Sequence, residues 1–93
     1  MLIHMVLWRF DDPADADEAI RRLRGLQREI DVVRRLAAGR NVVPSDRAYD
    51  VGLLLEVDSV EDLAVYRDHP AHVEVAQFVR ARSTAVAACD IEA

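Results

Sequence analysis

Lysine is absent from this chain of 93 residues, and all twelve basic side chains are arginine. Acidic side chains number 17, so the formal net charge is −5. An acidic chain argues against nucleic acid as the main partner, because binding to phosphate groups requires a basic surface.

Cysteine occurs once, at Cys89, which excludes an internal disulfide framework and fits a reducing compartment. No apolar run reaches the length of a membrane span. The first ten residues lack the basic start and the small-residue cleavage site of a signal peptide. These absences predict a cytoplasmic protein with no membrane partner.

Aromatic residues make up only 5% of the chain, while hydrophobic residues make up 52%. The core must therefore consist mainly of Val, Leu, Ile and Ala. A chain of this length forms one domain, residues 1–93, and buries only about 60–65% of the surface that its unfolded form exposes. We expect a modest core.

Residues 2–10 alternate in a way that predicts a β-strand with two apolar faces. A strand with one face in water normally alternates apolar with polar side chains. This strand therefore requires cover on both sides, which indicates a partner. One face carries Leu2, His4, Val6, Trp8 and Phe10, and the other carries Ile3, Met5, Leu7 and Arg9.

A helix is predicted over residues 13–29, because Asp12 suits a helix cap and Pro13 suits the first helical position. Apolar side chains from Ala16 to Ile30 recur at helical spacing. Gly25 inside this helix costs about 1 kcal/mol relative to alanine. We interpret it as the mark of a close contact between helix and sheet.

Residues 32–40 fit either a strand or a continuation of the helix. We favour a strand, because a second long helix here would leave the sheet with too few strands to close a core. Pro44 lies in a predicted loop at 41–47. Residues 49–57 then alternate as an internal strand.

Ser59 begins the next predicted helix, with Asp62 in a capping-box position. Pro70 divides this helix and starts a segment over 70–82, and a last strand follows at 84–92. The order β-α-β-β-α-β is the α+β, ferredoxin-like arrangement, with both helices on one sheet face. The other face is an apolar association surface, which predicts a homodimer that closes two sheets into a barrel.

His4, Tyr66 and His72 are the residues that could perform catalysis. An imidazole exchanges a proton near neutral pH, and a phenol can donate a hydrogen bond to a developing enolate. Together they could remove a proton beside a carbonyl without a cofactor. A buried histidine bonded to a hydroxyl or a backbone carbonyl is equally a common structural arrangement.

A ligand pocket beside these three residues is expected to include Trp8, His69 and Val79. His69 before Pro70 also fits a helix cap. His69 and His72 form an H-x-x-H pair, but two ligands do not define a metal site. We therefore predict neither a metal nor a cofactor.

Four segments together resemble the stress-responsive dimeric α/β-barrel proteins, or Dabb domain, nearly from end to end. The resemblance implies a ferredoxin-like protomer and a homodimeric barrel. Some relatives are polyketide cyclases, which by analogy makes His72 the base, with Tyr66 assisting it and His4 positioning or polarising the substrate. The segments are I-H-M-V-L-W-R-F at 3–10, G-R-N-V at 39–42, Y-D-V-G-L-L-L-E-V at 49–57 and Y-R-D-H-P-A-H-V-E-V at 66–75.

The leading hypothesis is a homodimer whose internal pocket binds a small apolar or carbonyl-bearing ligand. The first alternative is a cofactor-independent polyketide cyclase or aldol-type enzyme. A cofactorless monooxygenase is a further alternative, by analogy of fold alone. A purely structural, stress-related interaction protein is the fourth.

Overall fold

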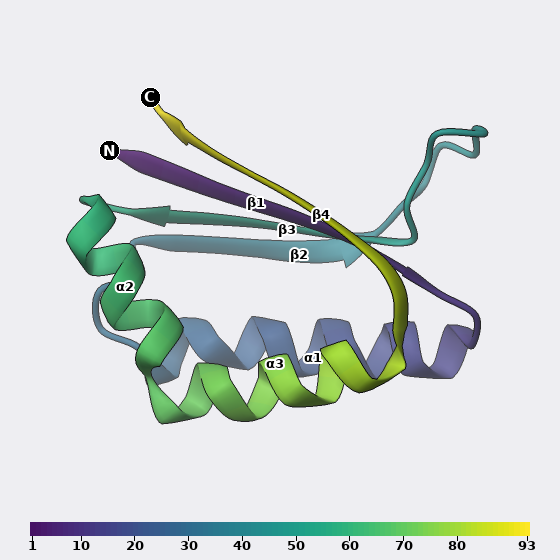
Figure 1. The fold of residues 1–93 in the computed structure, drawn as a ribbon, viewed down its shortest axis with the longest axis horizontal. Coiled ribbons are helices and arrows are strands. Elements are labelled where there is room, and N and C mark those ends of the chain that lie inside the picture. Colours follow the sequence, from purple (N-terminus) through teal and green to yellow (C-terminus); the bar gives the residue numbers. More distant parts are fainter.

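The computed structural model describes all of residues 1–93 as two layers, a four-stranded sheet and helices that cover one of its faces (Figure 1). The strands pair in the order β2-β3-β1-β4, and every pair is antiparallel. This confirms the ferredoxin-like arrangement. The elements are β1 (Leu2–Phe10), α1 (Pro13–Glu29), β2 (Arg35–Arg40), β3 (Val51–Val57), α2 (Val60–Asp68), α3 (Pro70–Arg82) and β4 (Ser83–Glu92).

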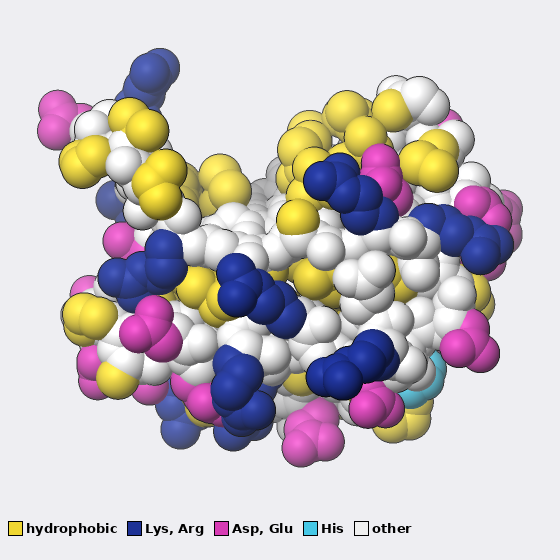
Figure 2. All heavy atoms as spheres, turned by 180° about the vertical axis from the view of Figure 1, so that it is seen from behind, with side chains coloured by type: hydrophobic (Ala, Val, Ile, Leu, Met, Phe, Trp, Pro, Cys, Tyr) yellow, Lys and Arg dark blue, Asp and Glu magenta, His cyan; other side chains and the backbone are white.

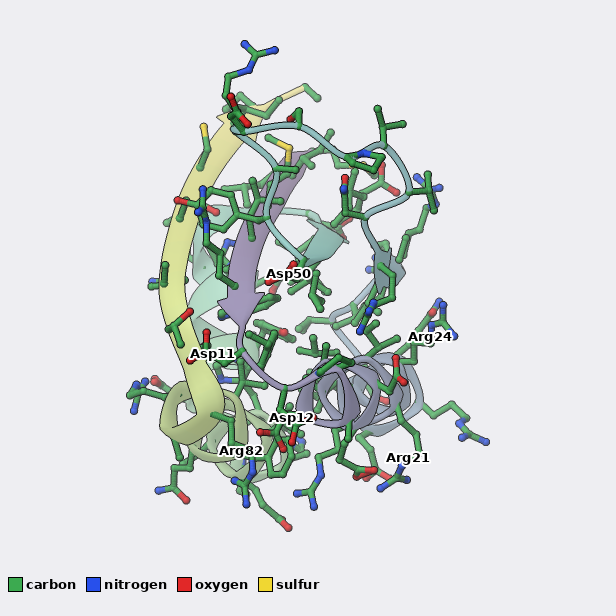
Figure 3. The ribbon with its side chains drawn as sticks, turned by 90° about the vertical axis from the view of Figure 1, so that its right-hand side faces the viewer. Asp11, Asp12, Arg21, Arg24, Asp50 and Arg82 are labelled. Carbon is green, nitrogen blue, oxygen red and sulfur yellow. The ribbon has the colours of Figure 1, made fainter.

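The predicted helix starts are confirmed, because each has the capping contact that its sequence suggests. The Asp12 carboxylate accepts a hydrogen bond of 2.9 Å from the backbone N–H of Ala14. Figure 3 shows Asp12 where the chain passes from β1 into α1. The Ser59 hydroxyl accepts one of 3.1 Å from the N–H of Asp62. These contacts satisfy N–H groups that have no partner inside the helix.

The helix-covered face of the sheet contains the core. Every second residue of β1 and β3 points toward α1, α2 and α3, as the alternation predicts. His4 is the one polar side chain among the buried residues. The core side chains of this face are Leu2, Val6 and Phe10 from β1, Val51, Leu53, Leu55 and Val57 from β3, and Ala16, Ala19, Ile20, Leu23 and Leu26 from α1.

The strand preferred over residues 32–40 is confirmed as β2, but it begins three residues later, at Arg35. Val33 is buried in the core, and its N–H donates to the carbonyl of Ile30, so the chain still turns there. The strand predicted from residue 49 likewise begins later, at Val51. The Asp50 carboxylate (Figure 3) instead accepts a hydrogen bond of 2.8 Å from the N–H of Phe10.

The prediction of a close helix–sheet contact at Gly25 is wrong. A Cβ atom placed on Gly25 would have no heavy atom within 4 Å. The residue faces a hollow at the surface and not the sheet.

The second face of the sheet has no helix over it and is largely apolar. Met5 of β1 pairs with Leu54 of β3 on one side and with Cys89 of β4 on the other. Leu7 and Ile91 on this face are 42% and 41% exposed. We call it the open face. It comprises Ile3, Met5, Leu7 and Arg9 of β1, Arg35, Ala37 and Gly39 of β2, Gly52, Leu54 and Glu56 of β3, and Ala85, Ala87, Cys89 and Ile91 of β4.

The segment between β2 and β3, residues 41–50, extends from the sheet away from the helices (Figure 1). We call it the arm. Between the arm and the open face lies a hollow of about 600 Å³, visible as the notch at the top of Figure 2. None of the helices is long and apolar enough to cross a membrane.

Candidate functional site

His4, Tyr66 and His72 come from three different elements and meet on the helix-covered side of the sheet. The ring centroids of Tyr66 and His72 lie 4.5 Å apart, and those of His4 and Tyr66 lie 6.3 Å apart. β1 contributes His4, α2 contributes Tyr66 and α3 contributes His72. The break at Pro70 lets α3 run in a new direction and bring His72 beside the last turn of α2.

All three residues line one cavity of about 320 Å³, which lies within the usual range for ligand sites. Trp8 of β1 and Val79 of α3 also line it, and α1, β3 and β4 contribute further walls. His69 does not line this cavity. Its Nδ1 atom accepts a hydrogen bond of 3.1 Å from the N–H of Ala71 and so caps α3.

His72 is held in a defined tautomer. Its Nδ1 atom lies 2.9 Å from the backbone carbonyl oxygen of Arg67. A carbonyl oxygen only accepts, so Nδ1 carries the proton and Nε2 keeps a free lone pair. Burial lowers the pKa of His72, and the nearby His4 adds to this effect. His72 is therefore neutral at neutral pH, the form in which an imidazole acts as a base.

Tyr66 is 1% exposed, and its hydroxyl has no hydrogen-bond partner within the chain. A buried hydroxyl without a partner costs about 1–3 kcal/mol. Burial also raises the pKa of Tyr66 well above its ordinary value. The phenol therefore keeps its proton at physiological pH and is available as a hydrogen-bond donor.

Asp90 is a site residue that the sequence interpretation missed. Its carboxylate accepts a hydrogen bond from Nδ1 of His4, and its other oxygen lies 3.8 Å from the guanidinium of Arg67. Asp90 thus fixes the orientation of the His4 ring. Arg67 contacts both sides of the site, because its side chain pairs with Asp90 while its carbonyl holds His72.

The signal that could have found Asp90 is the register of β1 against β4. His4 and Asp90 are direct partners in that antiparallel pair, although 86 positions separate them in the sequence. The residues of one strand do not reveal which residues of the neighbouring strand they pair with. No cluster of three or more His, Cys, Asp or Glu side chains is placed to hold a metal ion.

Chemically, the cavity combines a neutral imidazole with a free Nε2, a phenol that cannot easily ionise, and a second imidazole oriented by a carboxylate. Such a set can accept a proton and stabilise a developing oxyanion at the same time. The remaining wall is largely apolar, through Val6, Leu23, Leu53, Val75 and Val79.

The model of the stress responsive A/B barrel domain family matches residues 2–93 of the chain. No curated protein sequence matches the chain.

Three solved structures have the same fold over almost the whole chain. An Arabidopsis thaliana protein is 26% identical, with a TM-score of 0.86 over 100% of this chain and 95% of its own. A dimeric protein of unknown function with a ferredoxin-like fold, from Bacteroides fragilis, is 23% identical, with a TM-score of 0.87 over 99% and 95%. A hydroxynitrile lyase from Passiflora edulis is 18% identical, with a TM-score of 0.85 over 97% and 90%.

Proposed function

The chain belongs to the stress responsive A/B barrel domain family, and from this premise we propose that it binds a small carbonyl-bearing ligand in the cavity and promotes proton transfer at the carbon beside the carbonyl. This makes it a cofactor-independent enzyme of the aldol or lyase type. A protein of the same fold is named hydroxynitrile lyase, which supports an enzymatic function for this fold.

The observation that carries the proposal is the unpartnered hydroxyl of Tyr66. A folded chain rarely leaves a buried hydroxyl without a hydrogen bond. Tyr66 borders the cavity, and its ring lies beside that of His72. A ligand carbonyl oxygen in the cavity would accept the missing hydrogen bond and offset its cost.

In the proposed step, Nε2 of His72 takes a proton from the carbon beside the ligand carbonyl. The electron pair of that C–H bond forms the enolate double bond, and the carbonyl π pair moves to the oxygen. Tyr66 donates its hydrogen bond to this oxygen. The enolate C=C pair then forms a bond to a second carbonyl carbon, while the oxygen pair re-forms the first carbonyl. The π pair of the second carbonyl moves to its oxygen, and this alkoxide takes the proton from His72. The sequence needs no oxidant or reductant.

His4 has a positioning role in this proposal. Its ring is held by Asp90 and faces Tyr66 edge-on. An ordered imidazole at this place restricts where the ligand can lie, and correct placement contributes much of an enzyme's acceleration. Trp8 and Val79 supply apolar walls for the rest of the ligand.

The proposal includes a homodimer that packs two open faces together into a barrel. The open face is too apolar to remain in water, and a neighbour of the same fold is described as dimeric. The hollow between the arm and the open face would receive part of the second copy. A two-fold dimer of this kind uses the same patch on both chains.

Deuterium incorporation into benzylacetone in heavy water tests the chemistry. Wild-type protein is expected to accelerate exchange of the protons beside the carbonyl, which proton NMR follows directly. Removal of a general base typically lowers a rate by about a hundredfold or more, so His72→Asn should lose most of the acceleration. Tyr66→Phe should lose a comparable share, since it removes only the hydroxyl.

His69→Asn is the matched control. It removes an imidazole three residues away that does not line the cavity, and asparagine remains a good helix cap. Exchange at the wild-type rate is expected for this variant. Equal loss in His69→Asn and His72→Asn, or wild-type exchange in both cavity variants, would overturn the proposed chemistry and favour an interaction protein.

A further inference from the structure

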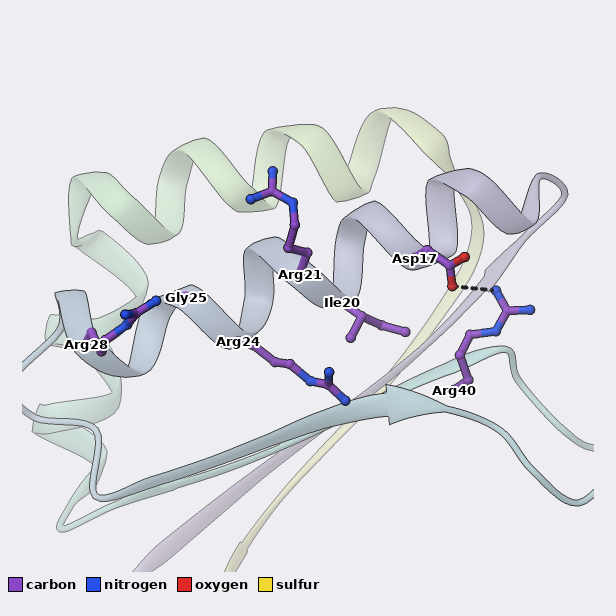
Figure 4. Close-up of a pocket in the computed structure, with 7 residues that line it drawn as sticks. All are labelled: Asp17, Ile20, Arg21, Arg24, Gly25, Arg28 and Arg40. Carbon is purple, nitrogen blue, oxygen red and sulfur yellow. Dashed lines mark hydrogen bonds and ion pairs between the residues drawn. The ribbon is translucent and has the colours of Figure 1, made fainter.

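A second hollow, of about 560 Å³, lies between α1 and the end of β2 (Figure 4). It shares no lining residue with the cavity that holds His4, Tyr66 and His72. Figure 2 shows arginine side chains gathered across the lower half of this side of the molecule. The hollow is lined by Asp17, Ile20, Arg21, Arg24, Gly25, Arg28 and Arg40.

The positive charge in this hollow is only partly compensated. Arg21 pairs with Glu18, and Arg40 lies 3.4 Å from the carboxylate of Asp17, whose side chain is 73% exposed. Arg24 extends toward β2 (Figure 4) and donates a hydrogen bond of 2.9 Å to a carbonyl, that of Ala38. Neither Arg24 nor Arg28 forms an ion pair with a carboxylate. A protein of net charge −5 thus concentrates two uncompensated guanidinium groups in one place.

Gly25 leaves the floor of the hollow bare. Glycine inside a helix costs about 1 kcal/mol relative to alanine, and either packing or function can be the reason for it. Packing gives no such reason here, because a Cβ atom at Gly25 would meet nothing within 4 Å. The effect of the glycine is to keep the space between Arg24 and Arg28 open.

We propose that this hollow binds the phosphate groups of a small phosphorylated ligand, of the diphosphate type. Arg24 and Arg28 are one helical turn apart, about 6 Å along α1, so both can reach one compact anion. A guanidinium presents two parallel N–H donors that fit phosphate oxygens, which makes arginine the preferred side chain for such a site. Arg40 reaches the same anion from β2 by leaving its weak contact with Asp17.

Isothermal titration of the full chain with inorganic pyrophosphate at low ionic strength tests the site. Wild-type protein is expected to bind one pyrophosphate per chain. Each charge-assisted hydrogen bond contributes enough that losing it weakens binding by about tenfold or more. The Arg24→Gln/Arg28→Gln variant should therefore bind at least tenfold more weakly, while Asp17→Asn should bind more tightly because it removes the competing carboxylate.

Two further variants separate a built site from general positive charge. Gly25→Gln changes no charge and improves helix propensity, yet its side chain fills the floor, so pyrophosphate binding should be lost while the melting temperature is kept or raised. Arg82→Gln removes one positive charge outside the hollow and should leave binding unchanged. No binding by wild-type protein, or equal weakening by Arg82→Gln and Arg28→Gln, would overturn the proposal.

Discussion

The two faces of the sheet are built from alternate residues of the same strands, but they differ in how far they are buried. In β3, Leu55 points toward the helices and is completely buried, while its neighbour Leu54 points to the open face and stays partly exposed. Three helices cover the first face, and nothing in one chain covers the second. The helices of one chain therefore cover only one of the two apolar faces that its strands form.

The covered face also differs from the open face in the polar groups that it contains and in where they lie. It buries His4 and an unpartnered Tyr66 hydroxyl in an otherwise apolar core. The open face carries its polar residues, Arg9 and Glu56 among them, at the periphery of an apolar centre formed by Met5, Leu7 and Leu54. The covered face therefore has the features of a ligand site, and the open face those of an association surface.

Leu55→Ala is expected to have the largest effect on the covered face. It deletes a fully buried side chain at the centre of the sheet, so the free energy of unfolding should fall by about 2–5 kcal/mol. Chemical denaturation followed by circular dichroism measures the change. A loss of well under 1 kcal/mol would mean that the core is less closely packed than the structure indicates.

Leu54→Glu tests the open face with a substitution one position away. The charge would lie in the apolar centre of the proposed interface, so the variant should be monomeric while its helical content stays close to wild type. Light scattering gives the mass, and circular dichroism checks the fold. A variant that remains a dimer would locate the interface elsewhere on the chain.

Tyr66→Phe should raise stability while it lowers activity. The substitution removes a hydroxyl that the core buries without a partner, so the free energy of unfolding should increase by about 1 kcal/mol in the absence of ligand. Thermal unfolding and the deuterium-exchange assay are run on the same preparation. A variant that is less stable than wild type would indicate a hydrogen bond at this hydroxyl and remove the main support for a ligand there.

His72→Gln should have the smallest effect on stability, visible as a change in the pH dependence of the free energy of unfolding. The folded-state pKa of His72 is lowered, so the unfolded chain binds its proton more readily below pH 6.5. Wild-type stability should therefore fall as the pH drops from about 6.5 toward the lower folded-state pKa, and the variant should lack this part of the slope. Equal slopes for both proteins between about pH 7 and pH 5 would contradict a buried, neutral His72.

Most of the fold could be predicted because its boundaries have local chemical causes. The caps at Asp12 and Ser59 and the break at Pro70 fix where the helices begin, and those starts agree with the structure. The start of β2 was less predictable, because Val33 is buried in a turn and alternates as a strand residue would. The prediction of a close contact at Gly25 was wrong for a similar reason. The sequence shows that a side chain is missing there, but it does not show which atoms lie beside the residue.

The grouping of side chains at the candidate site was predicted in part, and their roles stay predictions. His4, Tyr66 and His72 meet as their helix and strand positions suggest, because each lies on a face whose direction follows from periodicity. Asp90 and Arg67 could not be found in this way. Their roles depend on strand register and on a backbone carbonyl at the end of α2, and neither leaves a pattern in the residues nearby.

Sedimentation equilibrium of the wild-type protein tests the central claim most directly, since the claim is that a second copy covers the open face. At micromolar concentration, the account predicts a mass twice the 10.5 kDa of one chain. It also predicts that the mass falls toward that of one chain only on strong dilution. A mass of one chain throughout the micromolar range would contradict it, because the apolar open face would then stay in water.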